Sequence, residues 1–321
     1  MAINFSLRDF YDGTTEIVGI KSGLLLNRFQ VAKILLEKFD EKYLKSDDLD
    51  TYVRIHSGDL EEMLLRIRQK IGNLPENLPS RKAFEYLQEY SIKNKDITVA
   101  ATAASIGFQY LNSNNELTIE DLTKLIHKNE GYDKELSYAV AVISHEKFDQ
   151  SCIIPSSIGW DGGTELSKLY NCELKSENNF LEQKFIDYLA ANGDEIEIIH
   201  WRNFERFCAE YFKKQGYNVV LGPGTNDGGV DIRAYIENNK NSAPELLIQC
   251  KRYKKENKIS IETVKSFYTD VQFEQAKLGL IATTSYIAAG GKKVCKTRGY
   301  NVKFAERENI KNWAKQMWTH K

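Results

Sequence analysis

The sequence predicts two folded regions, a mainly α-helical N-terminal domain and a C-terminal α/β domain whose mixed sheet is flanked by helices. At 321 residues the chain exceeds the size of one ordinary domain, and 42% hydrophobic with 28% charged residues is the composition of a folded protein. Apolar residues recur every three or four positions in the first half, whereas short apolar runs alternate with helical patterns in the second. We therefore expect a helical domain at residues 1–175, a linker at 176–200 and the α/β domain at 201–321.

The first half shows helical spacing without an internal repeat. Five segments carry this spacing: residues 29–44, 60–71, 83–90, 99–111 and 136–148. The prolines of residues 73–79 interrupt helices, and Thr118-Ile119-Glu120-Asp121 has the Thr-x-x-acidic form of a helix start. A short helix at 181–189 and a turn at 192–194 follow, so we place the domain boundary between about residues 175 and 200.

The second half alternates helices and strands. A helix at 201–215 is followed by strands at 217–221, 230–236 and 246–251, a helix at 261–275, a strand at 278–282, a helix at 288–298, a strand at 302–305 and a last helix to Trp318. The order αβββαβαβα predicts a mixed sheet in which the early strands form a meander and crossover helices join the later ones.

The formal net charge of −1 conceals two opposite halves. Residues up to His200 contain 22 Lys and Arg against 33 Asp and Glu, a net charge of −11, whereas residues from Trp201 onward contain 22 against 12, a net charge of +10. The basic half suits a polyanion such as DNA, and the acidic half is a poor candidate for unspecific phosphate binding. Solvated charged faces would produce the same totals, so charge alone leaves both interpretations open.

No leader, membrane span or cysteine framework is visible in the sequence. The first ten residues lack a basic start followed by an apolar run, and no stretch approaches the roughly 18 apolar residues of a membrane span. The five cysteines are odd in number and never spaced as CxxC, which is typical of neither a disulfide framework nor a zinc site. We therefore expect a cytoplasmic protein with free thiols and no membrane partner.

Polar residues alternate with apolar ones in two neighbouring predicted strands. Alternation places Asp231 on a polar face outside the core and Ile236 on the opposite face, toward the core. In the next strand, Gln249 and Lys251 share one face. If the two strands pair, Asp231, Gln249 and Lys251 converge. Gly228-Gly229, just before the first of these strands, would let a phosphate backbone come close because it carries no side chains.

A carboxylate lies in the apolar stripe of the helix that opens the second half. Trp201, Glu205, Cys208 and Phe212 follow the spacing i, i+4, i+7 and i+11 of one helix face. Burying an unpaired charge costs several kcal/mol, which a hard cation bound jointly with Asp231 would remove. A Glu at the edge of the stripe, paired with a Lys or Arg, explains the same position without a metal. Taken alone, the helix favours the ion pair.

Several motifs in the second half together resemble one nuclease family. They are Phe204-Glu205, Gly216-Tyr217, Asp227-Gly228-Gly229-Val230-Asp231-Ile232, Gln249-Cys250-Lys251 and Thr283-Thr284-Ser285. This spaced combination, over residues 201–305, resembles the Mrr-like restriction endonucleases, a branch of the PD-(D/E)xK nuclease superfamily. The resemblance implies a restriction-endonuclease-like fold for the C-terminal domain. No proline precedes Asp231 and Gln249 replaces the usual acid, as this branch allows.

The resemblance also implies roles for the matching residues. The implied catalytic set contains the metal-binding Asp231, the variant triplet position Gln249, the catalytic Lys251 and the helix acid Glu205. Mg²⁺, or Mn²⁺ in its place, is the implied cofactor, because phosphodiester hydrolysis needs an activated water and a neutralised transition state. The amide oxygen of Gln249 and the carbonyl of Cys250 would add hard oxygen donors. Lys251 would orient the attacking water or hold the scissile phosphate.

Basic and hydroxyl-bearing residues flank this site in the sequence. The candidate DNA contacts are Arg252, Lys254, Lys255, Lys292, Lys293, Thr284 and Ser285. Contacts to backbone phosphates provide most of the sequence-independent affinity for DNA, and such side chains supply them. Taken singly, each lysine is better explained as a solvated surface residue, and the hydroxyls fit a cap of the helix that follows.

Three hypotheses of function follow. The first is a metal-dependent DNA endonuclease of a bacterial restriction or anti-phage system, whose helical domain decides when or where the second domain cuts. The second is a nuclease effector that a protein partner or small ligand switches on at the N-terminal domain. The third is a non-catalytic nucleic-acid-binding protein. A double-strand cut by one site per chain also makes a homodimer plausible.

Overall fold

A computed structural model of the chain describes residues 2–37, 44, 46–151, 162–224, 229–236 and 243–319. The chain divides into two compact units. One comprises Met1–His56, Glu62–Asn73 and Gly162–Lys321, and the other comprises Ser57–Glu61 and Leu74–Asp161. None of the described helices is long and apolar enough to cross a membrane. The boundary at 176–200 stays a prediction about independent folding, because this division groups earlier residues with the C-terminal ones.

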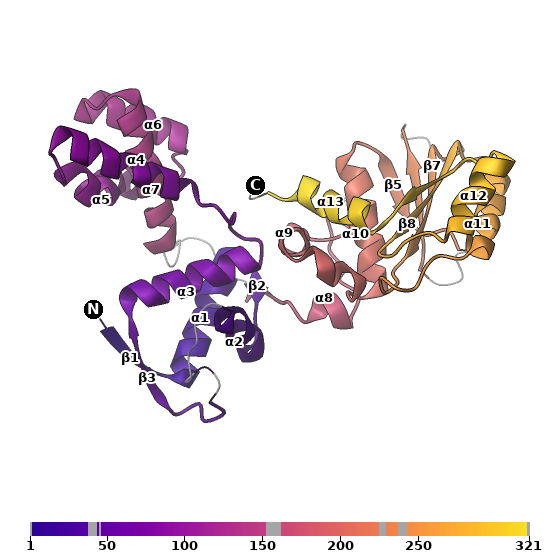
Figure 1. Ribbon diagram of the computed structural model, residues 1–321, viewed down its shortest axis with the longest axis horizontal. Coiled ribbons are helices and arrows are strands. Elements are labelled where there is room, and N and C mark those ends of the chain that lie inside the picture. Colours follow the sequence, from indigo (N-terminus) through magenta and orange to yellow (C-terminus); the bar gives the residue numbers. More distant parts are fainter. Residues whose placement is uncertain are drawn as a thin grey trace. The chain divides into compact units, whose positions relative to one another are not determined.

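The second of these units, called the helical unit below, is built from helices (Figure 1). They are α4 (Pro79–Asn94), α5 (Thr98–Ser113), α6 (Ile119–Glu130) and α7 (Lys134–Ser151). The last of them, α7, packs against the other three around a core of aliphatic side chains. The Thr118 hydroxyl accepts a hydrogen bond from Asp121 N at 3.1 Å, so the predicted start of α6 is confirmed. The mainly helical character predicted for this part of the chain is confirmed as well.

Helices α5 and α7 approach each other closely at Gly107. A Cβ atom placed on this glycine would lie 2.2 Å from the Cβ of Ser144, closer than real side chains come. The Ser144 hydroxyl donates to the carbonyls of Ala103 and Val140, each at 2.7 Å. Glycine is therefore required here by the packing of the two helices.

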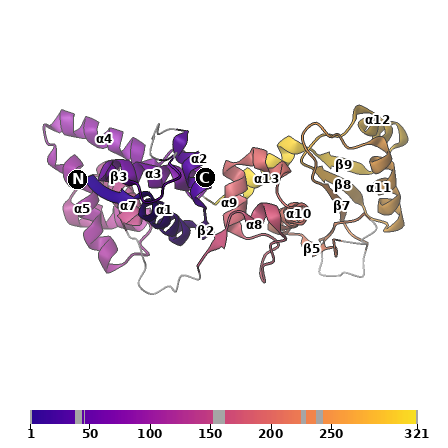
Figure 2. The same cartoon turned by 90° about the horizontal axis from the view of Figure 1, so that it is seen from below.

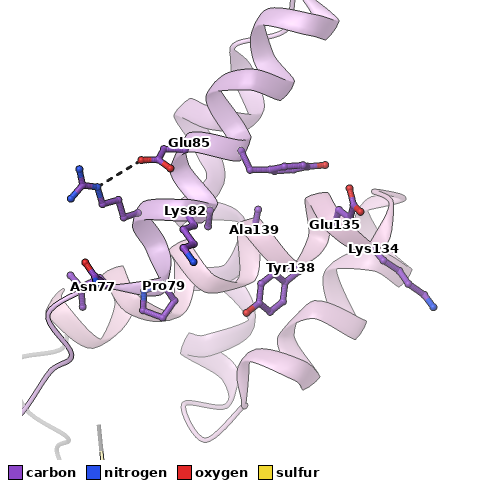
Figure 3. A pocket seen from close by; sticks show the side chains of 12 residues that line it. Asn77, Pro79, Lys82, Glu85, Lys134, Glu135, Tyr138 and Ala139 are labelled. Atoms are coloured by element: carbon purple, nitrogen blue, oxygen red, sulfur yellow. Dashed lines mark ion pairs between the residues drawn. The ribbon is translucent and has the colours of Figure 1, made fainter. Parts of the chain in front are cut away.

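A pocket of about 1040 Å³ opens between the first turns of α4 and α7 (Figure 3). Its apolar lining includes Pro79 and the ring of Tyr138, which is 54% exposed. Charged residues of both signs surround it, among them Arg81 and Glu85, whose Nε and Oε1 atoms are 3.7 Å apart. This mixed lining favours neither an anionic nor a cationic ligand.

The first residues of the chain contain strands and a helix that the periodicity did not predict. These elements are β1 (Ala2–Ser6), α1 (Leu7–Ser22), β2 (Leu24–Leu25) and β3 (Tyr52–His56). The helices α2 (Arg28–Leu36) and α3 (Ser57–Lys70) correspond to those predicted at 29–44 and 60–71. β1 and β3 form an antiparallel pair. Helix α1 was not predicted because it contains Gly13 and Gly19, which are weak helix formers and interrupt its apolar spacing. Its N-cap is Ser6, which accepts from Asp9 N at 3.1 Å.

Short elements lead into the α/β domain. They are β4 (Thr164–Glu165), α8 (Lys168–Asn171), α9 (Gln183–Ala191) and the 3₁₀ helix η2 (Gly193–Glu197). The helix predicted at 181–189 corresponds to α9. Strand β4 pairs in parallel with β2, and Trp318 Nε1 donates to the Gly72 carbonyl at 2.7 Å. These contacts explain why early residues belong to the same unit as the C-terminal ones.

The α/β domain has the predicted element order. It contains α10 (Trp201–Lys214), β5 (Asn218–Leu221), β6 (Ile232–Tyr235), β7 (Leu246–Lys251), α11 (Ile261–Phe273), β8 (Leu278–Thr283), α12 (Ala289–Arg298), β9 (Val302–Ala305) and α13 (Arg307–Met317). The strands follow the spatial order β5-β6-β7-β8-β9. The pairs β5–β6 and β6–β7 are antiparallel, and β7–β8 and β8–β9 are parallel. The predicted meander followed by crossover helices is thus confirmed.

Helices cover both faces of this sheet (Figures 1 and 2). Helices α10 and α13 contact one face, and α11 and α12 pack on the other around a shared hydrophobic core. On β8, a Cβ atom placed on Gly279 would lie 2.5 Å from Val271 Cγ2 and 3.0 Å from Phe267 Cε1, both on α11. The sheet is therefore buried on two sides, and this determines how its polar residues are placed.

Candidate active site

Asp231 lies immediately before β6 and is held by main-chain groups. Its Oδ2 accepts a hydrogen bond from Cys250 N at 2.6 Å, and its own N–H donates to Ile248 O at 3.1 Å. The expectation that Asp231 lies outside the core is wrong, because its exposed fraction is 7%. Ile236, expected in the core, is 62% exposed, since β6 ends at Tyr235. With helices on both faces of a sheet, strand alternation does not separate core from solvent.

Gln249 has one satisfied and one unsatisfied side-chain atom. Its Nε2 donates to the Gly229 carbonyl at 2.7 Å, whereas its Oε1 is buried and has no hydrogen-bond partner among the described residues. Gly229 has φ +89°, and a Cβ there would lie 3.1 Å from Gln249 Nε2. Glycine at this position thus serves the contact with Gln249. Its predicted neighbours Asp227 and Gly228 lie outside the described residues.

Cys250 connects the two acidic residues of the candidate site. Its main chain pairs with Ala282 of β8, and its N–H binds Asp231. Burial raises the pKa of the Cys250 thiol well above its ordinary value, and the neighbouring Cys208 and the negative charges of Asp231 and Glu205 raise it further. Cys250 itself is a buried structural residue, not a nucleophile.

Glu205 is buried in an ion pair on α10. Its Oε2 is 2.5 Å from Arg202 Nη1, and the side chains are 7% and 9% exposed. The guanidinium of Arg202 also donates to the Gly222 carbonyl at 2.6 Å. Of the two interpretations of Glu205, the structure contains the ion pair. Trp201, predicted in the same buried stripe, is 41% exposed because it occupies the first turn of the helix.

Sequence reasoning did not single out Arg202, although its spacing of three residues from Glu205 is the signal that finds it. Among the described residues, no three His, Cys, Asp or Glu side chains gather in an arrangement that could hold a metal ion. Gln249 and the half-buried Lys251 lie at the end of β7, where Asp231 binds the intervening Cys250 N–H, and the amide oxygen of Gln249 has no hydrogen-bond partner in the part of the chain that the structure describes.

Residues 196–314 match the family Mrr_cat, described as a restriction endonuclease. They form an Mrr-type restriction endonuclease domain. The match begins within η2 and ends within α13, so it spans the whole five-stranded sheet. The fold predicted from the motifs is confirmed for this domain.

Individual relatives of the Mrr-type domain are distant. The chain is 24% identical over 123 residues to the "Uncharacterized protein y4cE" of Sinorhizobium fredii (strain NBRC 101917 / NGR234), which covers 38% of this chain and 31% of that protein. It is similar to the structure of the MspJI restriction endonuclease in complex with a 27-mer oligonucleotide, with a TM-score of 0.32, 13% identity, and coverage of 51% of this chain and 36% of that one. The DNA modification-dependent restriction endonuclease AspBHI gives a TM-score of 0.30, 18% identity and coverage of 45% and 37%. The chain spans about a third of the length of each of these proteins.

The candidate DNA contacts of the Mrr-type domain fall into two groups. Lys254, Lys255, Lys292 and Lys293 are exposed, as a phosphate-binding role requires. Lys255, Lys258 and Lys292 line a shallow pocket of about 600 Å³. Arg252 is half-buried, and its Nη1 donates to the Glu197 carbonyl at 3.0 Å.

Thr284 and Ser285 form the second group, for which the sequence left open a DNA contact or a cap of the following helix. Both are fully buried. The Thr284 hydroxyl donates to the Tyr253 carbonyl at 2.6 Å, and the Ser285 hydroxyl donates to the Lys255 carbonyl at 3.0 Å. These hydroxyls hold the loop after Lys251. Sequence reasoning could not find this, because the loop and the hydroxyls are about thirty residues apart.

Proposed function

We propose that the Mrr-type domain hydrolyses phosphodiester bonds of DNA with the help of a divalent metal ion, Mg²⁺ or Mn²⁺. The observation that carries this proposal is the buried Oε1 of Gln249, which has no hydrogen-bond partner among the described residues and belongs to the strand paired with β6, just before which Asp231 lies. A buried oxygen without a donor is costly, and a hard cation would satisfy it. The restriction endonuclease family supports DNA as the substrate.

The residues present fit such an ion. Asp231 would supply the anionic ligand, and the Gln249 amide and the Cys250 carbonyl would supply neutral oxygens. Glu205 would join only if its pair with Arg202 opened, because that carboxylate is already neutralised. When bound, the metal would lower the pKa of a coordinated water and neutralise charge on the phosphate. With one carboxylate instead of two in the triplet region, we expect weak metal binding in the absence of DNA.

Lys251 would act on the phosphate or on the attacking water. It is the last residue of β7, half-buried, and its carbonyl accepts from the Thr283 hydroxyl at 2.7 Å. A fixed main chain limits the region that the ammonium group can reach, and beside the scissile phosphate its charge would stabilise the transition state. The exposed Lys254, Lys255, Lys292 and Lys293 would bind neighbouring phosphates.

In the cell, this activity suits a restriction or anti-phage enzyme whose helical unit decides when or where the Mrr-type domain cuts. Activation by a protein partner or small ligand at the N-terminal part remains the alternative proposal, as does action as a homodimer. Cleavage by the purified chain alone would favour the first, and cleavage only after a partner is added would favour the second. No metal-dependent cleavage under either condition would favour a non-catalytic DNA-binding protein.

The decisive experiment compares Asp231→Asn and Lys251→Ala with the wild-type chain in Mg²⁺-dependent cleavage of plasmid DNA. Asn is chosen because it keeps an oxygen for Cys250 N–H, which Ala would leave buried without a partner. We expect each variant to lose at least about a hundredfold in rate, which is about 2.7 kcal/mol in activation free energy.

The two variants should differ in DNA binding. Mg²⁺ should no longer strengthen binding by Asp231→Asn, whose metal-free affinity should be equal or higher because a negative charge is lost. Lys251→Ala should keep the effect of metal but bind DNA slightly more weakly. Glu120→Gln, at a 79% exposed position of α6, is the control and should cleave normally. Wild-type cleavage by Asp231→Asn or Lys251→Ala would remove the site assignment.

A further inference from the structure

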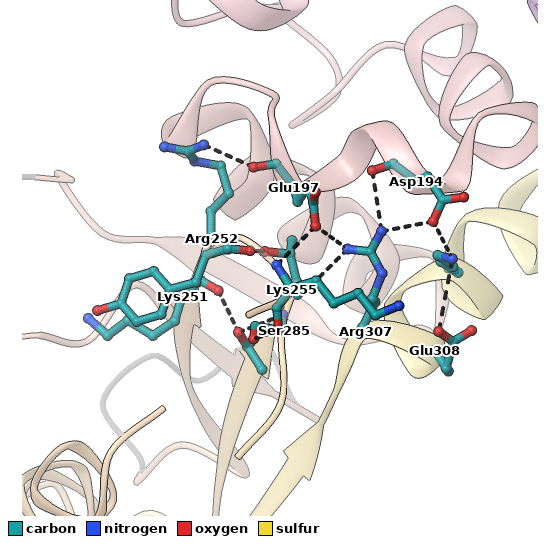
Figure 4. Close-up of polar contacts among 12 residues, drawn as sticks. Asp194, Glu197, Lys251, Arg252, Lys255, Ser285, Arg307 and Glu308 are labelled. Atoms are coloured by element: carbon teal, nitrogen blue, oxygen red, sulfur yellow. Dashed lines mark hydrogen bonds and ion pairs between the residues drawn. The ribbon is translucent and has the colours of Figure 1, made fainter. Parts of the chain in front are cut away.

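The loop that follows Lys251 is also held from η2. The Glu197 carboxylate accepts a hydrogen bond from Lys255 N, with 3.1 Å between Oε2 and N. Its main-chain carbonyl accepts from Arg252 Nη1 at 3.0 Å. Glu197 therefore binds both ends of the loop 252–255 (Figure 4). Glu197 precedes the loop in the sequence, whereas Thr284 and Ser285, whose hydroxyls also hold the loop, follow it.

A buried arginine holds Glu197 in this position. Arg307, the first residue of α13, is 4% exposed, and its Nη1 lies 2.5 Å from Glu197 Oε2. The same Nη1 donates to the Thr284 carbonyl at 3.1 Å, so one guanidinium joins both anchors of the loop. Burial would lower the pKa of Arg307, but the hydrogen bonds and charges of Asp194 and Glu197 raise it, and the group stays charged.

Burying Arg307 has a free-energy cost. A buried guanidinium loses its hydration, and Arg307 regains only part of this through two carboxylates. One of them, Asp194, is 81% exposed and 2.8 Å from Arg307 Nη2. The other, Glu197, is 23% exposed and is the one that contacts the loop. A pair that only neutralised Arg307 would not need to reach Lys255 N.

We propose that Glu197, held by Arg307, is a positioning residue that fixes the loop 252–255 and thereby orients Lys251 and the basic residues after it toward the phosphate. The inference rests on the proposed nuclease function. The contacts of Glu197 among the described residues are with Arg252, Lys255 and Arg307, so in this proposal it acts through the loop.

A positioning role of Glu197 predicts a different outcome from a purely electrostatic role. Replacing Glu197 with Ala removes a negative charge beside Arg252 and Lys255, so electrostatics alone should leave DNA affinity equal or higher. Loss of loop geometry should nevertheless lower the cleavage rate at saturating DNA by about tenfold to a hundredfold, because small misplacements near a reacting group have effects of this size. The expected signature is a lower kcat with an unchanged or lower KM.

Asp194→Ala is the matched control, since it also removes one carboxylate that pairs with Arg307 but does not contact the loop. We expect it to cleave at the wild-type rate. Glu197→Gln keeps an oxygen for Lys255 N–H but not the charge, and it should lose less activity than Glu197→Ala. Melting curves of the three full-length variants show whether each is folded at the assay temperature.

The experiment measures single-turnover and steady-state cleavage of plasmid DNA in Mg²⁺, with DNA affinity measured in Ca²⁺. A fall in kcat confined to the Glu197 variants supports the proposal. Wild-type kcat in Glu197→Ala, or an equal fall in Asp194→Ala, overturns it while the proposed function stands. If the wild-type chain itself does not cleave, the proposed function fails and this inference fails with it.

Discussion

The helical unit and the Mrr-type domain bury different kinds of polar side chain. Among the described residues, the buried polar side chains of the helical unit are uncharged serines: Ser91, Ser137 and Ser144. The Mrr-type domain buries charged groups, among them Arg202, Glu205, Glu210, Asp231 and Arg307, each 7% exposed or less. A buried charge destabilises a fold unless it is paired. Of these two regions, the one proposed to do chemistry is thus the one that buries charged groups, while the helical unit buries serines and aliphatic side chains.

The largest expected effect on stability comes from breaking a buried ion pair of the Mrr-type domain. Glu205→Gln removes the charge that faces Arg202 and should lower the free energy of unfolding by about 3 kcal/mol without metal. Glu120→Gln in the helical unit breaks the exposed pair with Lys124 and should cost less than about 0.5 kcal/mol. Urea unfolding of both variants in EDTA measures the difference.

The result also decides between the two interpretations of Glu205. If a metal alone compensates this carboxylate, the metal-free protein should be as stable with Gln as with Glu. Unchanged stability of Glu205→Gln in EDTA would therefore contradict the structural role of the Arg202 pair.

A packing defect in the helical unit should have a smaller effect and leave chemistry alone. Gly107→Ala places a methyl group against Ser144 and should destabilise this unit by about 1 to 3 kcal/mol. Below the melting temperature, metal-dependent cleavage should match wild type. Gly13→Ala is the control, because the added methyl group would have no atom of the described residues within 4 Å. A cleavage defect in folded Gly107→Ala would show that the two units are functionally coupled.

The basic surface should respond to salt only where it meets DNA. Lys255→Ala should reduce the slope of log affinity against log salt by about one and weaken binding modestly. Lys124→Ala, at a 67% exposed position of the helical unit, should leave the slope unchanged. Titrations by fluorescence anisotropy at four salt concentrations measure these slopes. Equal slopes for the wild-type chain and both variants would mean that DNA binds elsewhere than at Lys255.

The smallest expected effect concerns His200, the N-cap of α10. Its Nδ1 accepts from Arg202 N at 3.3 Å, and burial lowers the pKa of the ring. The unfolded chain, with a pKa of about 6.5, therefore takes up a proton before the folded chain does. Stability should be fully present above this pH and fall by less than about 1 kcal/mol as the pH drops through it.

The control for this effect is His200→Asn, which keeps a cap acceptor but does not titrate. Unfolding by urea at pH 8 and pH 5.5 should show a smaller loss in this variant than in the wild-type chain. The remaining histidines contribute equally to both proteins. An identical loss in both would mean that His200 does not act as a pH-dependent cap.

The order of elements in the Mrr-type domain could be predicted because each one is long enough to show its own period. β7 and β9 have the predicted bounds, Leu246–Lys251 and Val302–Ala305. The strands β1 and β3 could not be found in this way, since a two-stranded pair is identified by its distant partner and not by its own pattern. The same limit applies to Ile236, whose alternation continues past the last hydrogen bond of β6.

For the candidate site, residue types were predictable and their partners were not. Motif spacing identified Asp231, Gln249 and Lys251, and the role of each stays a prediction that the variants above test. The contact between Arg307 and Glu197 spans 110 positions, so no local signal announces it. The burial of Asp231 also depends on helices that cover the sheet from both sides, with α10 before this residue in the chain and α11 and α12 after it.

The three consecutive hydroxyl residues at the end of β8 bind alternate carbonyls of the neighbouring segment. Thr283 binds that of Lys251 at 2.7 Å, and Thr284 and Ser285 bind those of Tyr253 and Lys255. Side chains thus continue the pairing of β7 and β8 beyond the point where the backbone ladder stops. The Tyr253 amide also donates to Thr284 Oγ1, at 2.8 Å, although its side chain is exposed. In hydrogen–deuterium exchange, this amide should be protected like those of a strand, in a segment whose surface resembles a loop.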